Sequence, residues 1–157
     1  MIILGIDPGT TIIGYGVVEH SNNTMRGLAY GVIRNPGKDK LADMKSTTQE
    51  LAKLIQAHNP DAMAIERLYF SNNQKTAMAV SEMRGVILLT AALHDLSVQE
   101  FTPLQVKQFV SGYGGADKKQ VQNMVRLILN IKEDIRPDDA ADALALAMCG
   151  YHRPERG

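Results

Sequence analysis

The sequence predicts an α/β protein with a mixed five-stranded sheet and helices on both faces of that sheet. Three observations support this prediction. Three strand-like segments separated by turn residues come first, the apolar residues then take on a helical period, and two short buried strands follow with helical segments between and after them. A hairpin meander followed by right-handed β-α-β crossovers produces a sheet of this kind.

The N-terminal segments carry the meander. Residues 1–7 form a nearly continuous apolar run, typical of a strand buried on both faces, and Pro8-Gly9 ends the run with a turn. Residues 11–19 are rich in β-branched and aromatic side chains, which predicts the second strand of a hairpin. After a turn at Asn22-Asn23, we expect the third strand at residues 25–33.

Helices and strands alternate in the rest of the chain. Apolar residues recur at helical spacing over residues 41–57, and Asn59-Pro60 ends that helix. Residues 62–66 and 98–101 are expected to be short buried strands, with a long Ala- and Met-rich helix over residues 72–93 between them. The remaining helices are expected at residues 103–110, 118–129 and 137–149. This element order is that of the ribonuclease-H-like fold.

Length and composition indicate one domain, residues 1–157, with a frayed tail beyond Pro154. The hydrophobic fraction of 45% allows a full core without metal or disulfide staples. The single Cys149 cannot form an intrachain bridge and favours a reducing, cytoplasmic setting. We expect no membrane span, because the apolar runs fall short of the ~20 residues that a bilayer requires, and the N-terminus lacks a signal peptide's basic segment.

Charge is unevenly distributed although the net charge is zero. Residues 101–130 contain a lone acid, Asp117, and the basic residues Lys107, Lys118, Lys119 and Arg126. Residues 133–142 contain the acids Glu133, Asp134, Asp138, Asp139 and Asp142. A basic segment beside an acidic one suits a protein that grips phosphates and holds divalent cations. Two ordinary solvated faces explain the same charges equally well.

Two carboxylates stand at the ends of predicted buried strands. Asp7 ends the first apolar run and Glu66 ends the run at residues 62–65. An ionised carboxylate at such a place is costly unless it is paired or binds a metal. The alternatives are that Asp7 bonds the backbone of the Pro-Gly turn and that Glu66 pairs with Arg67. If the two strands are adjacent and parallel, both carboxylates face one end of the sheet, where α/β sites form.

A third acidic group opens the last helix. Asp139 and Asp142 are three positions apart, and Asp138 and Asp142 four, so either pair can share a helix face. Capping and the helix dipole explain Asp138 and Asp139 well. They explain Asp142 poorly, because it lies deeper in an Ala- and Leu-rich helix. The small alanines would let this helix approach the sheet closely and bring Asp142 near Asp7.

Together these acids make an oxygen-only donor set. No zinc-type spacing accompanies them, since the histidines are scattered at His20, His58, His94 and His152. Hard oxygen ligands suit Mg²⁺ or Mn²⁺. Two ions about 3.5–4 Å apart could clamp the attacking and leaving oxygens of a phosphodiester. The acids therefore predict hydrolysis by an activated water without a covalent enzyme intermediate.

Four segments in fixed order span nearly the whole chain. They are LGIDPGTTIIGYG (residues 4–16), AIERLYFSNN (64–73), QVKQFVSGYGGADKKQVQNMV (105–125) and PDDAADALALA (137–147). Together they closely resemble the RuvC family of bacterial Holliday-junction resolvases. The resemblance implies a homodimer that nicks two opposing strands of a four-way DNA junction, leaving 5′-phosphate and 3′-hydroxyl ends. It also implies two Mg²⁺ ions per active site, replaceable by Mn²⁺, and a branch-migration motor of the RuvA/RuvB type as partner.

The resemblance also implies roles for single residues. The catalytic and metal-binding acids it implies are Asp7, Glu66, Asp139 and Asp142. Asp138 is an extra acid beside the DAAD pattern and a further candidate ligand. The DNA-binding residues it implies are the aromatics Tyr69 and Phe70 and the lysines Lys107, Lys118 and Lys119. A base-stacking aromatic is physically sensible, and we expect at least one of the two aromatics to pack in the core instead.

A dimer suits the substrate, because a four-way junction has approximate two-fold symmetry and needs two cuts. The helix at residues 72–93 is apolar on more than one side and is the candidate interface. The alternative is a helix fully buried within one monomer.

Other functions fit parts of the sequence. An actin-like sugar kinase or chaperone ATPase shares the GIDPGTT opening but needs two duplicated domains and a second phosphate loop, which this chain lacks. A non-catalytic module that binds branched DNA is a second alternative. Four carboxylates facing the DNA argue against it, because they repel the phosphates unless a metal ion is bound. Another nuclease of the same fold, such as one that acts on RNA, is distinguished from a junction enzyme only by the resemblance.

Overall fold

The strands form the predicted meander followed by two crossovers. The computed structural model describes residues 1–67 and 74–150. The sheet has the order β3-β2-β1-β4-β5. Its strands are β1 (Ile2–Asp7), β2 (Ile12–Ser21), β3 (Thr24–Arg34), β4 (Ala62–Glu66) and β5 (Ser97–Phe101). The pairs β1–β2 and β2–β3 are antiparallel, whereas β4 runs parallel to both β1 and β5, which confirms the mixed five-stranded sheet.

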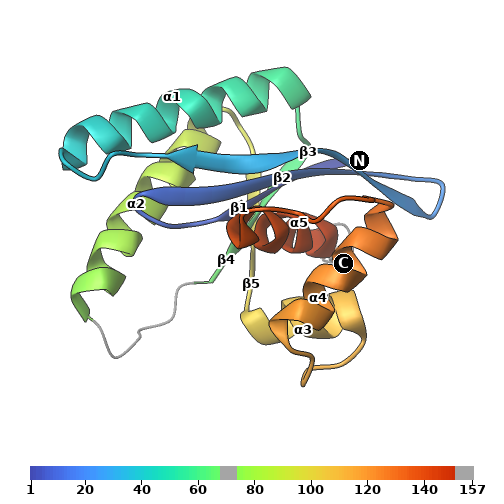
Figure 1. Ribbon diagram of the computed structural model, residues 1–157. Coiled ribbons are helices and arrows are strands. Elements are labelled where there is room, and N and C mark those ends of the chain that lie inside the picture. The colour runs from blue at the N-terminus through green and yellow to red at the C-terminus, as the bar shows by residue number, and fades with distance from the viewer. Residues whose placement is uncertain (68–73, 151–157) are drawn as a thin grey trace, which may run out of the picture.

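Five helices cover the two faces of this sheet (Figure 1). They are α1 (Lys40–His58), α2 (Gln74–Leu93), α3 (Pro103–Ser111), α4 (Lys118–Leu129) and α5 (Asp138–Gly150). Helices α1 and α2 pack on one face, and α3, α4 and α5 on the other. The predicted elements are confirmed with small shifts of their ends. For example, the last helix begins at Asp138 rather than at Pro137.

Strand alternation sends apolar side chains into two separate cores. Leu4 and Ile6 of β1 pack with Met63 and other residues under α1 and α2. Ile3 and Ala64 face the opposite way, toward α3, α4 and α5. Because successive side chains of a strand point to opposite faces, Asp7 and Glu66 fall on the α5 face.

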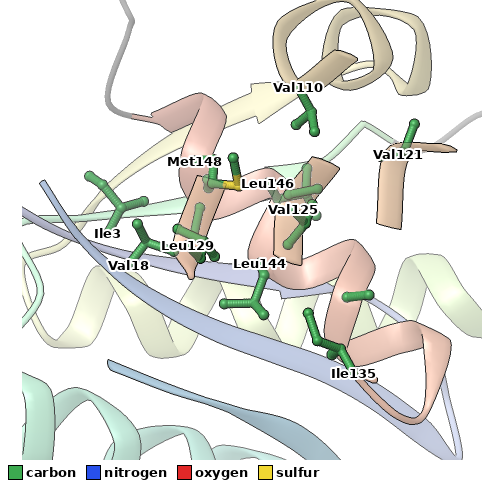
Figure 2. Close-up of a cluster of buried hydrophobic side chains, with 14 of the residues drawn as sticks. Ile3, Val18, Val110, Val121, Val125, Leu129, Ile135, Leu144, Leu146 and Met148 are labelled. Atoms are coloured by element: carbon green, nitrogen blue, oxygen red, sulfur yellow. The ribbon is translucent and has the colours of Figure 1, made fainter. Parts of the chain in front are cut away.

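Helix α5 is the centre of the second core. It contacts β1, β2, β3 and β4 beneath it, and α3 and α4 pack against it from the other side. Figure 2 shows Leu144, Leu146 and Met148 of α5 among side chains of the covering helices, such as Val125 and Leu129. Every residue of α5 is buried except its three aspartates. The only polar side chains of this helix are therefore gathered near its N-terminal end.

Three strand glycines bring α5 unusually close to the sheet. A Cβ at Gly5 would lie 2.0 Å from the Ala143 carbonyl oxygen, and one at Gly14 would lie 2.0 Å from that of Asp139. A Cβ at Gly16 would lie 2.7 Å from the Leu144 nitrogen. The helix backbone therefore rests directly on the strands. The predicted close approach is confirmed, with the strand glycines contributing as much as the alanines.

Helix α2 is only partly buried. Met83, Ile87 and Ala91 pack in the core, but Met78 and Leu89 are 65% and 60% exposed. The interpretation of this helix as fully buried in the monomer is therefore wrong. Among the described residues α2 is long and apolar enough to cross a membrane by length and composition alone. The apolar composition of α2 is equally explained by its packing on the sheet as a partly covered core helix.

We predict that Gly5→Ala destabilises the protein by about 3 kcal/mol or more, because the new methyl group meets helix backbone that cannot rotate away. Gly27→Ala, in β3 of the same sheet, is the matched control. Its Cβ would lie 3.4 Å from a side-chain carbon of Ile131, an ordinary contact, so its stability should stay within about 0.5 kcal/mol of wild type. Urea unfolding followed by circular dichroism measures both, and equal stabilities would contradict the close packing of α5.

Candidate active site

Strand pairing places two of the carboxylates side by side. The parallel strands β1 and β4 pair Ile6 with Ile65. Asp7 and Glu66 are the next residues along, so both carboxylates emerge together at the carboxyl ends of adjacent strands. That edge is where functional sites of α/β proteins form.

Helix α5 adds the remaining acids. Asp7 pairs with Gly14 across β1 and β2, and Gly14 lies directly beneath the backbone of Asp139. One turn further on, Asp142 lines a pocket of about 260 Å³ together with Asp7 and Glu66. The glycine contact that lets α5 approach the sheet thus also brings its acids over the two strand carboxylates.

Crowding and burial make this cluster unfavourable for negative charge. Burial, followed by the charges of Asp142, Glu66 and Asp139, raises the pKa of Asp7 to about 8. Burial and the nearby Asp142 likewise raise the pKa of Glu66. Burial also raises the pKa of Asp142, with Lys118 acting in the opposite direction. A bound cation would remove the repulsion among these groups.

Lys118, the first residue of α4, supplies positive charge at the pocket. Its ammonium nitrogen lies 3.5 Å from a carboxylate oxygen of Asp142 and 3.7 Å from one of Asp138. Burial lowers the pKa of Lys118, but the carboxylates of Asp142, Asp138 and Asp139 outweigh it, so the pKa is raised. The capping box of Asp117 and Gln120 fixes the start of α4, and with it the position of this lysine.

The alternative roles of the strand acids find no support within the described residues. Asp7 makes no hydrogen bond there to the backbone of the Pro8-Gly9 turn; its pKa is instead raised partly by a hydrogen bond with Asp139. Arg67 pairs with Glu100, at 3.7 Å, rather than with Glu66.

The donor set fits a hard divalent cation. Its groups are carboxylate oxygens, the ligands that Mg²⁺ and Mn²⁺ prefer. Burial and the neighbouring acids raise the pKa values of Asp7 and Glu66, so a bound cation would favour their ionised form. Across residues 1–67 and 74–150, however, no three Asp, Glu, His or Cys side chains already converge on one point. Asp7, Glu66 and Asp142 line one pocket without forming a finished cage, and the Asp142 carboxylate lies beside the Lys118 ammonium. Asp139 lines the neighbouring groove instead.

The predicted basic residues divide between two places. Lys107, from α3, lines the pocket with the three carboxylates, and so does Lys118. Lys119 lies outside that pocket, in a neighbouring groove that Lys118, Asp138 and Asp139 also line. The predicted aromatics Tyr69 and Phe70 fall outside the described residues.

Sequence reasoning missed a partly buried arginine behind the site. The Arg84 side chain, 14% exposed, comes from α2 and donates from Nη2 to Glu100 at 2.8 Å. Its Nε also donates to the backbone carbonyl of Glu66 at 3.4 Å. Arg84 therefore links α2 to the end of β4 that carries a catalytic candidate. The sequence feature that could have indicated this role is a single arginine within an apolar helix, because a charge that is partly buried needs partners.

Comparison with known proteins identifies the family. Residues 3–150 match the family described as "Crossover junction endodeoxyribonuclease RuvC". A relative of that name from Alkaliphilus metalliredigens is 50% identical over 153 residues, which cover 97% of this chain and 93% of the relative. The chain belongs to the RuvC family. It is thus a member of a family of endonucleases, as predicted.

Solved structures agree with this assignment. The chain matches a structure described as T. thermophilus RuvC in complex with Holliday junction substrate, with a TM-score of 0.90 and 34% identity over 95% of this chain and 92% of that one. A yeast mitochondrial Holliday junction resolvase matches with a TM-score of 0.64 at 14% identity, over 94% of this chain and 77% of that one, a likeness of fold alone. These matches confirm the ribonuclease-H-like fold.

We predict that Asp7→Asn stabilises the metal-free protein increasingly as pH rises. The pKa of Asp7 is raised from its ordinary value of 3.8 to about 8 in the folded protein. Between pH 3.8 and about pH 8 the folded state therefore holds a proton that the unfolded state has released, and the free energy of unfolding falls as pH rises through this window. In EDTA, urea unfolding should show the variant more stable than wild type by about 1–3 kcal/mol at pH 8.5, and by less at pH 5.5.

Asp95→Asn removes the same charge at an exposed position after α2 and controls for this comparison. It should change stability little at either pH. A variant Asp7→Asn that is less stable than wild type at pH 8.5 would contradict the charge repulsion inferred for the cluster.

Proposed function

We propose that this chain is a divalent-metal-dependent endonuclease that resolves four-way DNA junctions by paired symmetric nicks. The proposal depends mainly on one observation, the gathering of Asp7, Glu66 and Asp142 with Lys107 and Lys118 in one pocket. The family supports it, since RuvC-type nucleases depend on divalent metal ions. A T. thermophilus relative of high structural similarity is described in complex with a Holliday junction substrate.

The acids are the proposed metal ligands. Asp7 and Glu66 contribute from the sheet, and Asp139 and Asp142 from α5, with Asp138 as a further candidate at the exposed start of that helix. We propose two Mg²⁺ ions, or Mn²⁺ in their place. When bound, such ions supply Lewis-acid stabilisation and a water of lowered pKa, which suits hydrolysis to 5′-phosphate and 3′-hydroxyl ends.

The lysines act on the substrate phosphate. Lys107 and Lys118 hold positive charge where the phosphate oxygens gain negative charge in the transition state. A cation bound by Asp142 would compete with the Lys118 ammonium for that carboxylate. The displaced ammonium would then be available to bind the phosphate. Lys119 and the aromatics Tyr69 and Phe70 are proposed to contact the DNA around the cut.

The active protein is proposed to be a homodimer. One chain provides one carboxylate pocket among its described residues, and two symmetric cuts need two such pockets related by a two-fold axis. The exposed apolar residues of α2 are Met78, Leu89 and Leu93, and we propose this face as the interface. Arg84 would then connect the interface helix to Glu66.

The family also supplies the cellular context of the proposal. We propose that the enzyme works in the cytoplasm, where the buried free Cys149 stays reduced. A branch-migration motor of the RuvA/RuvB type is the proposed partner, and recombination and repair the proposed processes. The whole of residues 1–157 is proposed to act as one nuclease domain.

A nicking assay tests the proposed reaction. With Mg²⁺, the wild-type protein should cut a synthetic mobile four-way junction at two symmetric positions. Asp7→Asn should still bind the junction but cut it at least ~100-fold more slowly, because the site loses a charged ligand. Asp95→Asn should cut like wild type. Wild-type binding without cleavage in Mg²⁺ or Mn²⁺ would favour a recruitment module, and absence of junction binding would favour another nuclease of this fold.

Sedimentation tests the proposed interface. Leu89→Asp places a charge on the exposed face of α2 and should convert the dimer to monomers while leaving the monomer folded, because that side chain is 60% exposed. Leu127→Asp is the matched control on α4, where the leucine is 74% exposed, and should remain dimeric. A dimeric Leu89→Asp variant would place the interface elsewhere.

A further inference from the structure

A second groove lies beside the catalytic pocket. It is formed by α4, by the segment that leads into α5 and by the end of β3, and it encloses about 1190 Å³. We call it the α4 groove; the cations that line it are Arg34, Lys118, Lys119, Arg126 and Arg136. Lys118 lines both this groove and the catalytic pocket. The two hollows therefore lie on either side of Lys118, the residue that faces the carboxylates.

The α4 groove is basic after its internal ion pairs are taken into account. Asp134 lies 3.0 Å from Arg126 and 3.8 Å from Arg136, and Asp138 lies 3.7 Å from Lys118. Asp134 therefore offsets part of the charge of Arg126 and Arg136, and Asp138 part of that of Lys118.

Two exposed cations have no such partner. Arg34, at the end of β3, and Lys119, in the first turn of α4, make no ion pair with any described residue. They line the same groove and come from elements far apart in the sequence. Their charges are available to an incoming anion.

Two residues that line the groove also have a buried hydrogen-bond donor without an acceptor among the described residues. Gln122 Nε2 and Arg126 Nε, both on α4, are buried and have no acceptor among the described residues. Buried donors without acceptors are rare in folded proteins. Both nitrogens are buried, so the groups that the groove offers to an incoming phosphate are its exposed cations, Arg34 and Lys119.

We propose that the α4 groove binds backbone phosphates of the DNA strand that is cut, on the side where this strand leaves the catalytic pocket past Lys118. The proposal rests on the proposed function, because it takes the scissile phosphate to lie at the carboxylates. Arg34 and Lys119 contact phosphates of this flanking segment, with Arg136 at the rim. These are contacts to backbone rather than bases, so they add affinity without sequence preference.

The salt dependence of junction binding tests the groove. In an Asp7→Asn background, which stops cleavage, Arg34→Gln with Lys119→Gln should weaken binding to a four-way junction about tenfold near 0.15 M salt. It should also reduce the slope of log Kd against log salt concentration by about four, because the proposed dimer loses two phosphate contacts in each of its two subunits. Fluorescence anisotropy measures both quantities, and melting curves check that the exposed substitutions leave the fold intact.

The matched control removes two charges on the opposite side of the sheet. Lys45→Gln with Lys53→Gln changes exposed lysines of α1 and should leave the slope unchanged. Equal slopes for the groove and control variants would overturn the α4 groove, and the proposed function would still stand if wild type nicks the junction. A wild-type protein that neither binds nor nicks the junction would overturn the proposed function and the groove together.

Discussion

The contact between α5 and the glycines of the central strands is the constraint on which the site depends. Gly5 and Gly14 leave no space for a side chain beneath the backbone of Ala143 and Asp139. A helix held further away would leave its acids short of the carboxylates at the ends of β1 and β4. The same contact buries all of α5 except its three aspartates, so core packing and the arrangement of the site cannot be separated.

This arrangement opposes the stability of the metal-free protein. Burial and neighbouring acids raise the pKa values of Asp7, Glu66 and Asp142, and such shifts record unfavourable charge in the folded state. Lys118 reduces the repulsion from one side only. A site of this kind is explained by binding rather than by folding, because a cation and a phosphate together would supply the charge balance that the chain lacks.

Much of the fold follows from local patterns, and the site follows in part. Apolar runs ended by Pro8-Gly9 or by Glu66 predict the strands and place both acids at strand ends. Whether α2 is buried or exposed could not be predicted, since an Ala- and Met-rich helix has the same composition in either case. The ion pair of Arg84 with Glu100 and the groove between Arg34 and Lys119 join distant segments. Such pairings depend on the packed structure and leave no periodic pattern in the sequence.

The most direct test is a crystal structure of the protein with Mn²⁺, in which anomalous scattering locates the metal. The account predicts one or two peaks about 2.0–2.3 Å from carboxylate oxygens of both Asp7 on β1 and Asp142 on α5, with the Lys118 ammonium moved away from Asp142. It also predicts that Glu66 joins this ligand set. Peaks confined to the exposed Asp138, or no peak between the sheet and α5, would contradict the claim that packing of α5 on the strands assembles a metal site.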